Sequence, residues 1–139
     1  MGVRKEVTVK VPATSGNIGP GFDVLGLALD FYNELRVRVI GSKGRPVIHV
    51  RGEGEGVLPE DERNVIYQAI RFVFKKARVP LPKLELECLN RIPLARGMGS
   101  SAAAFVSGLL AGNRLSGGKF SLDRILYWGT ALEGHPDDV

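Results

Sequence analysis

The stretch NRIPLARGMGSSAAAF, residues 90–105, sets a glycine-rich turn directly before a strong helix former. Residues 84–90 lead into it with alternating apolar and polar side chains, which predicts a strand. Gly97 and Gly99 then allow the backbone to turn tightly. An alanine- and leucine-rich run from Ser100 to about Leu115 predicts a helix. The predicted order is therefore strand, glycine-rich loop, helix.

This order of elements favours the binding of a phosphate group. The first turn of a helix leaves backbone N–H groups without partners, and the helix dipole adds partial positive charge there. Glycines let the backbone approach a bulky anion closely. The hydroxyls of Ser100 and Ser101 stand at the mouth of the helix, where one could bind a phosphate oxygen or a magnesium ion. The alternative is an ordinary helix cap preceded by a tight turn.

Two common phosphate-binding motifs do not match this loop. The pattern GxxxxGK[ST] requires a lysine before the serine, and Gly99 is followed directly by Ser100. The pattern GxGxxG requires a third glycine, and Ala102 or Ala103 stands in its place. Neither short motif explains the loop, so its interpretation has to rest on its whole sequence.

The rest of the chain predicts one domain that mixes strands and helices. Its 139 residues are enough to bury a core. Alternating apolar residues predict further strands at residues 7–11, 35–39 and 47–50. Apolar residues at helical spacing predict helices over residues 65–77 and 122–133, capped by Asn64 and Ser121. The sequence ends in GHPDDV without a tail or linker, so we expect a truncated chain.

Composition narrows the class of protein. The net charge of +4 permits an anionic partner, but the basic residues are scattered and do not alternate with aromatic residues, so nucleic-acid binding is not supported. The single cysteine, Cys88, excludes an internal disulfide and suits the core. The sequence shows no signal peptide and no apolar run of bilayer length. The simplest interpretation is a cytoplasmic protein with no membrane partner.

The string P-L-A-R-G-M-G-S-S-A-A resembles the ATP loop of the GHMP kinases. Members of that family carry a proline, an aliphatic residue, two variable residues and then G-[LM]-G-S-S-A. The resemblance implies an α+β fold over residues 1–139, the N-terminal ATP-binding domain of the family, which is similar to domain 2 of ribosomal protein S5. It also implies that the loop wraps the triphosphate of ATP. The implied nucleotide-binding residues are Pro93, Leu94, Ala95, Arg96, Gly97, Met98, Gly99, Ser100, Ser101, Ala102 and Ala103.

Asn64 resembles the asparagine that opens a helix near the adenine in these kinases. The resemblance therefore adds Asn64 to the nucleotide-binding residues. Its alternative role is the helix cap, which needs no ligand.

A second stretch, PATSGNIGPGFDVLGLAL at residues 12–29, resembles the amino-terminal motif of the homoserine kinase branch of that family. In that branch the residue matching Asp23 holds the substrate amino group, and the residue matching Asn17 lies beside the substrate. Taken from the residues alone, Asn17 can form a turn and Asp23 can cap the segment that follows. The resemblance favours substrate contact.

A third stretch, EGHPDDV at residues 133–139, resembles the E-G-H-x-D-N-V-A-P segment of the same enzymes. It implies that Glu133 holds Mg²⁺ together with Ser101, with Asp137 as the alternative carboxylate. It also implies that His135 faces the substrate. Asp138 replaces the family asparagine that contacts the attacking hydroxyl. An aspartate there can accept the proton, but it also brings negative charge near the phosphates.

Together the three stretches imply an enzyme that transfers the γ-phosphoryl group of ATP to the side-chain hydroxyl of L-homoserine, with Mg²⁺ as the metal. They leave a homodimer open. Homoserine kinases are much longer, so the C-terminal domain is missing and we expect this chain alone to be inactive. Two alternatives remain: a GHMP kinase for another small alcohol, such as shikimate or mevalonate, and a non-catalytic nucleotide-binding module.

Overall fold

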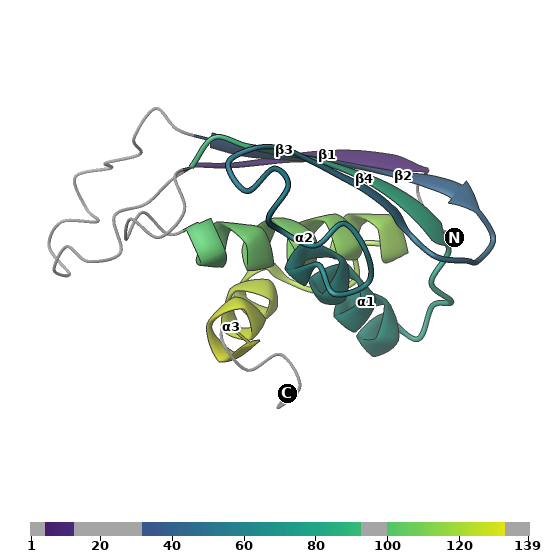
Figure 1. The fold of residues 1–139 in the computed structure, drawn as a ribbon. Helices are drawn as coiled ribbons and strands as arrows, with labels where there is room; N and C mark the ends of the chain where they lie inside the picture. The colour runs from purple at the N-terminus through teal and green to yellow at the C-terminus, as the bar shows by residue number, and fades with distance from the viewer. Residues whose placement is uncertain (1–4, 13–31, 93–99, 133–139) are drawn as a thin grey trace, which may run out of the picture.

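The computed structural model describes residues 5–12, 32–92 and 100–132 of the chain (Figure 1). Within these residues the chain forms four strands and three helices. Their order and bounds are β1 (Glu6–Pro12), β2 (Tyr32–Gly41), β3 (Val47–Gly52), α1 (Val65–Ala77), β4 (Lys83–Asn90), α2 (Ser100–Ser116) and α3 (Leu122–Leu132). Each element covers a segment that the sequence predicts, so the α+β prediction is confirmed.

The four described strands form one sheet in the order β1-β2-β4-β3. β1 pairs with β2 and β2 pairs with β4 in antiparallel fashion, whereas β3 runs parallel to β4. A parallel pair needs a crossover connection, and α1 supplies it between β3 and β4. The register sets Val9 opposite Leu35 and Leu35 opposite Cys88, so the apolar residues of neighbouring strands share one face.

Helices α1 and α2 cover that apolar face of the sheet (Figure 1). The larger core cluster joins sheet residues such as Val37 and Leu86 to Ile70 and Phe74 of α1 and Leu115 of α2. A second cluster lies on the far side of α1 and α2 and joins them to α3. The result is three layers: the sheet, then α1 with α2, then α3. No helix in the described residues has the length and apolar character that crossing a bilayer would require.

The close approach of α1 and α2 depends on two glycines of α2. A Cβ atom added at Gly108 would lie 2.7 Å from the carbonyl oxygen of Ile66, and one added at Gly112 would lie 3.1 Å from the Cα of Ile70. These glycines are four residues apart and therefore share one face of the helix. They allow α2 to lie against the backbone of α1, which places the N-terminal ends of both helices beside the sheet.

The opposite face of the sheet carries charged side chains in alternating signs. Arg38 pairs with Glu85, whose carboxylate also lies 3.7 Å from Nε2 of His49, and Nη1 of Arg36 lies 3.5 Å from Oε1 of Glu87. The Arg38 guanidinium holds the pKa of the Glu85 carboxyl below its ordinary value. Exposed pairs of this kind add little stability. This face agrees with the interpretation of the scattered basic residues as a solvated surface.

Candidate functional site

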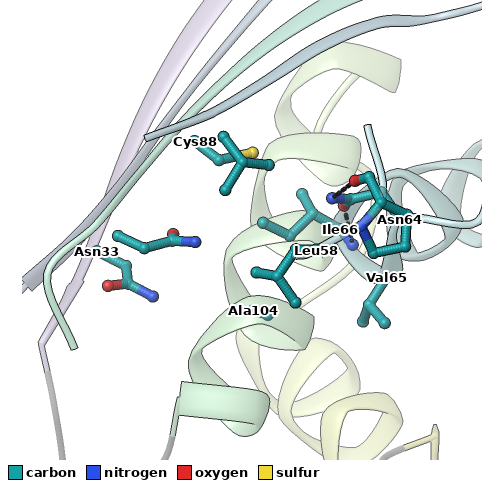
Figure 2. A pocket seen from close by; sticks show the side chains of 10 residues that line it. Asn33, Leu58, Asn64, Val65, Ile66, Cys88 and Ala104 are labelled. Atoms are coloured by element: carbon teal, nitrogen blue, oxygen red, sulfur yellow. Dashed lines mark hydrogen bonds between the residues drawn. The ribbon is translucent and has the colours of Figure 1, made fainter. Parts of the chain in front are cut away.

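A cavity of about 210 Å³ lies between the sheet and the N-terminal ends of α1 and α2 (Figure 2). Its wall is mostly apolar, and its polar groups are three asparagines. The residues that line it are Asn33, Val50, Leu58, Pro59, Asn64, Val65, Ile66, Cys88, Asn90 and Ala104. They come from the ends of β2, β3 and β4, from the β3–α1 connection, and from the first turns of two helices. The fold therefore gathers segments far apart in the sequence round one hollow.

Asn64 forms the α1 side of the cavity and caps that helix. Its Oδ1 accepts hydrogen bonds from the backbone N–H groups of Ile66 at 2.8 Å and Tyr67 at 3.3 Å. Its Nδ2 donates to the carbonyl oxygen of Pro59 at 2.9 Å, which ties the incoming loop to the helix (Figure 2). The predicted cap is confirmed. The predicted contact of Asn64 with the nucleotide stays a prediction, and its carboxamide already has structural partners.

The β3–α1 connection is fastened to the end of β4. Gly52 has φ +86°, and a Cβ atom there would lie 2.3 Å from the carbonyl oxygen of Asn90, so only glycine lets the two strands end this close. The backbone N–H of Glu53 donates to the carbonyl oxygen of Asn90 at 2.9 Å. Nδ2 of Asn90 donates to the carbonyl oxygen of Glu53 at 3.2 Å. These bonds hold the sheet side of the cavity in place.

Asn33 holds the chain immediately after β4. Its Oδ1 accepts hydrogen bonds from the backbone N–H groups of Arg91 at 2.9 Å and Ile92 at 3.0 Å. Asn33 is 8% exposed and Ile92 is fully buried. The side chain therefore fixes the last described residues before the predicted phosphate loop.

Cys88 lies in the sheet wall of the cavity. Burial raises the pKa of its thiol to about 12, and the negative charge of Glu60 acts in the same direction. The thiol is therefore neutral at physiological pH and is a poor nucleophile there. The prediction that Cys88 is a core residue is confirmed by its 2% exposure.

The strand and the helix of the predicted order are both present, because β4 ends at Asn90 and α2 begins at Ser100, while the predicted loop at residues 93–99 lies outside the described residues. The N-terminus of α2 opens beside the cavity, since Ala104 lines it. Ala103 is buried against Ile92. An anion at this helix end would meet the partial positive charge of the dipole.

Most of the predicted site residues lie outside the described part of the chain. They are Asn17, Asp23, Pro93, Leu94, Ala95, Arg96, Gly97, Met98, Gly99, Glu133, His135, Asp137 and Asp138. For Ser100, Ser101 and Ala102 the structure describes the helix but not the side chains. Within the described residues, no three His, Cys, Asp or Glu side chains gather in a way that could hold a metal ion. The predicted magnesium ligands are not among these residues.

The cavity itself is not among the features that the sequence predicts. Asn33 and Asn90 carried a usable signal, because each stands at an inward position of a strand whose other inward residues, such as Leu35 and Leu86, are apolar. A polar residue at a buried position needs a partner or a role. No comparable signal marks the cavity's aliphatic residues.

The size and wall of the cavity restrict what it can hold. Sites for drug-sized ligands are roughly 300–1,000 Å³, so a cavity of about 210 Å³ suits one ring system and not a whole nucleotide. Its apolar wall suits the faces of a flat ring, and the asparagines offer hydrogen bonds to its edge. A charged extension of the ring could reach the N-terminus of α2.

These features define an α+β domain in which an apolar cavity lies beside a helix N-terminus that follows a glycine-rich segment. The chain belongs to the GHMP kinase family: residues 64–139 match the family described as "GHMP kinases N terminal domain". That match covers more than half of the chain and confirms the resemblance of its loop.

Curated relatives extend the similarity over nearly the whole chain. A homoserine kinase from Corynebacterium urealyticum is 49% identical over 137 residues, which cover 99% of this chain and 44% of the relative. A homoserine kinase from Leifsonia xyli is 51% identical over 137 residues, with 97% and 42% covered. The chain thus spans less than half the length of the curated relatives it matches.

Solved structures agree on the fold. A homoserine kinase from Cytophaga hutchinsonii superposes with a TM-score of 0.72 at 26% identity, covering 94% of this chain and 42% of that one. A mevalonate kinase from Methanococcus jannaschii superposes with a TM-score of 0.70 at 13% identity, covering 95% and 47%. The second likeness concerns the fold alone.

Proposed function

We propose that this chain is the nucleotide-binding part of a homoserine kinase, which transfers the γ-phosphoryl group of ATP to the side-chain hydroxyl of L-homoserine. The observation that carries the proposal is the cavity beside the N-terminus of α2. It would receive the adenine ring, and the helix end with the preceding glycine-rich segment would receive the phosphates. Identity of about half with curated homoserine kinases supports the acceptor.

The remaining roles follow the sequence motifs. Gly97, Gly99, Ser100 and Ser101 would cradle the phosphates, and Ser101 with Glu133 would hold Mg²⁺. Catalysis by such a site consists mainly of positioning and charge neutralisation, as phosphoryl transfer allows.

The acceptor side would be formed by Asn17, Asp23, His135 and Asp138. Asp138 would face the hydroxyl that attacks the γ-phosphorus and would accept its proton. Cytoplasmic localisation and a soluble small-molecule acceptor belong to the same proposal.

Two measurements test this proposal separately. Titration calorimetry of the 139-residue chain with a non-hydrolysable ATP analogue tests the nucleotide site. Turnover of the complete gene product with ATP and a panel of homoserine, mevalonate, shikimate and galactose tests the acceptor. We expect analogue binding and a preference for homoserine. Binding without homoserine turnover would refute the acceptor and keep the nucleotide site.

A GHMP kinase for another small alcohol is the second candidate, and Asp138 is the observation that favours it. The family asparagine is replaced there by a side chain that carries charge. Turnover of the Asp138→Asn variant with the same panel of alcohols tests whether Asp138 selects the acceptor. An unchanged order of preference would show that Asp138 does not select the acceptor.

A further inference from the structure

Asn33 has one polar atom that its structural role leaves unused. Within the described residues, both hydrogen bonds to its side chain end on Oδ1, which accepts from the N–H groups of Arg91 and Ile92. These two donors fix the orientation of the carboxamide, because the flipped orientation would set its NH₂ group against two other N–H groups. Nδ2 must therefore point away from Arg91 and Ile92.

The direction left to Nδ2 is the cavity. Nδ2 of Asn33 has no hydrogen-bond partner among the described residues, although the side chain is more than nine-tenths buried. Among these residues no side-chain nitrogen or oxygen is both sealed from solvent and unpartnered. Asn33 lines the cavity on the side opposite Asn64, so Nδ2, which is turned away from Arg91 and Ile92, is placed to face it (Figure 2).

We propose that Asn33 is a specificity residue of this cavity, where its Nδ2–H donates a hydrogen bond to an unprotonated ring nitrogen of a bound purine base. The inference rests on the proposed nucleotide-binding function and adds a residue to it. A base has apolar faces, which suit Val50, Leu58 and Ile66, and in-plane nitrogen acceptors at its edge. A locked donor in an apolar wall selects for such an acceptor, because a ligand without it leaves a buried N–H unpaired.

Asn33→Asp isolates the donor from the positioning role. An aspartate keeps an oxygen for the N–H groups of Arg91 and Ile92 and replaces the donor with an acceptor. Asn113→Asp is the matched control. Asn113 also bonds backbone groups through its carboxamide, but it uses both ends, toward Phe120, and it lies about 13 Å along α2 from Ala104.

The experiment is calorimetry of the 139-residue chain with a non-hydrolysable ATP analogue, repeated with analogues in which each ring nitrogen of adenine in turn is replaced by C–H. We expect Asn33→Asp to weaken binding about tenfold or more, and Asn113→Asp to leave it unchanged. One C–H analogue should bind the wild type more weakly than the parent analogue does. The same replacement should cause no further loss of affinity in Asn33→Asp.

Each other outcome counts against the inference. Equal affinity of wild type and Asn33→Asp overturns the contact while the proposed function stands. If Asn33→Ala binds the analogue more weakly and Asn33→Asp binds it normally, Asn33 only positions Arg91 and Ile92. That result also overturns the inference. No loss with any C–H analogue rules out a ring nitrogen. Analogue binding by neither wild type nor variants overturns the proposed function and this inference with it.

Discussion

Gly99 separates the two interpretations of the glycine-rich segment at the level of one residue. We expect Gly99→Val to abolish binding of an ATP analogue with little change in Tm. If the segment binds the phosphates as proposed, valine adds a branched side chain where the backbone would have to approach them, and it disfavours positive φ. Calorimetry and thermal melting of the same samples measure both effects.

Gly117 supplies the contrasting variant. It follows α2 with φ +121° and open space around it, so Gly117→Val should lower Tm through backbone strain and leave analogue affinity unchanged. If Gly99→Val behaves like Gly117→Val, the segment is only a helix cap.

Cys88 makes stability depend on pH in a defined direction. Burial raises its thiol pKa from 9.0 to about 12, so between these values the folded chain keeps a proton that the unfolded chain releases. The free energy of unfolding therefore falls as pH rises through this window, and below about pH 9 the contribution is fully present. Urea titrations at about pH 8 and about pH 10 should show a steeper fall for wild type than for Cys88→Ala. Equal falls would mean that the thiol does not titrate differently in the two states.

At the scale of elements, α1 ends in a conformation that its sequence does not favour. Arg78 has φ 60° and ψ 40°, and its N–H bonds back to the carbonyl groups of Phe74 and Lys75. A left-handed residue at this position is usually glycine. Arg78→Gly should stabilise the fold by about 0.5–1 kcal/mol, because the strain removed exceeds the entropy that glycine adds to the unfolded chain.

Urea titration measures this change. Lys76→Gly, inside the last turn of α1, is the control and should destabilise the fold by about 1 kcal/mol. A loss of stability in Arg78→Gly would show that the arginine side chain contributes contacts at the helix end.

The elements could be predicted from the sequence, whereas their pairing could not. Alternation at Val7 and Val9, or at Leu84 and Leu86, states which face of a strand is buried, since side-chain direction has period two. It does not state which strand lies next to it. The insertion of β4 between β2 and β3 depends on where α1 packs, and that depends on long-range contacts such as Gly108 against Ile66.

The candidate site also has one part that the sequence predicts and one part that it does not. The glycine-rich segment before α2 is local, so the sequence shows it directly. The cavity is made by five separate parts of the chain, and only its buried asparagines differ from ordinary core residues. The proposed function of Asn33 thus depends on two facts that no local pattern contains: the bonds to Arg91 and Ile92, and the place of Asn33 in the wall of the cavity.

For the molecule as a whole, α1 links the two core clusters. Ile70 and Phe74 belong to the sheet-side cluster, and Ala69 and Val73 belong to the cluster that holds α3. If the packing of either cluster is disrupted, one apolar face of α1 becomes exposed. We therefore expect the described domain to unfold as a single cooperative unit.

The chain carries one natural reporter in each cluster. Trp128, the only tryptophan, packs edge-on against Phe72 and Phe120 on the α3 side, with ring centroids 5.1 and 4.9 Å apart. Cys88, the only cysteine, is 2% exposed on the sheet side. Urea unfolding followed by Trp128 fluorescence and by the reactivity of Cys88 toward a thiol reagent should give one midpoint and one free energy. A Trp128 transition at lower urea, with Cys88 still protected, would show that α3 unfolds before the sheet and that α1 does not couple the two clusters.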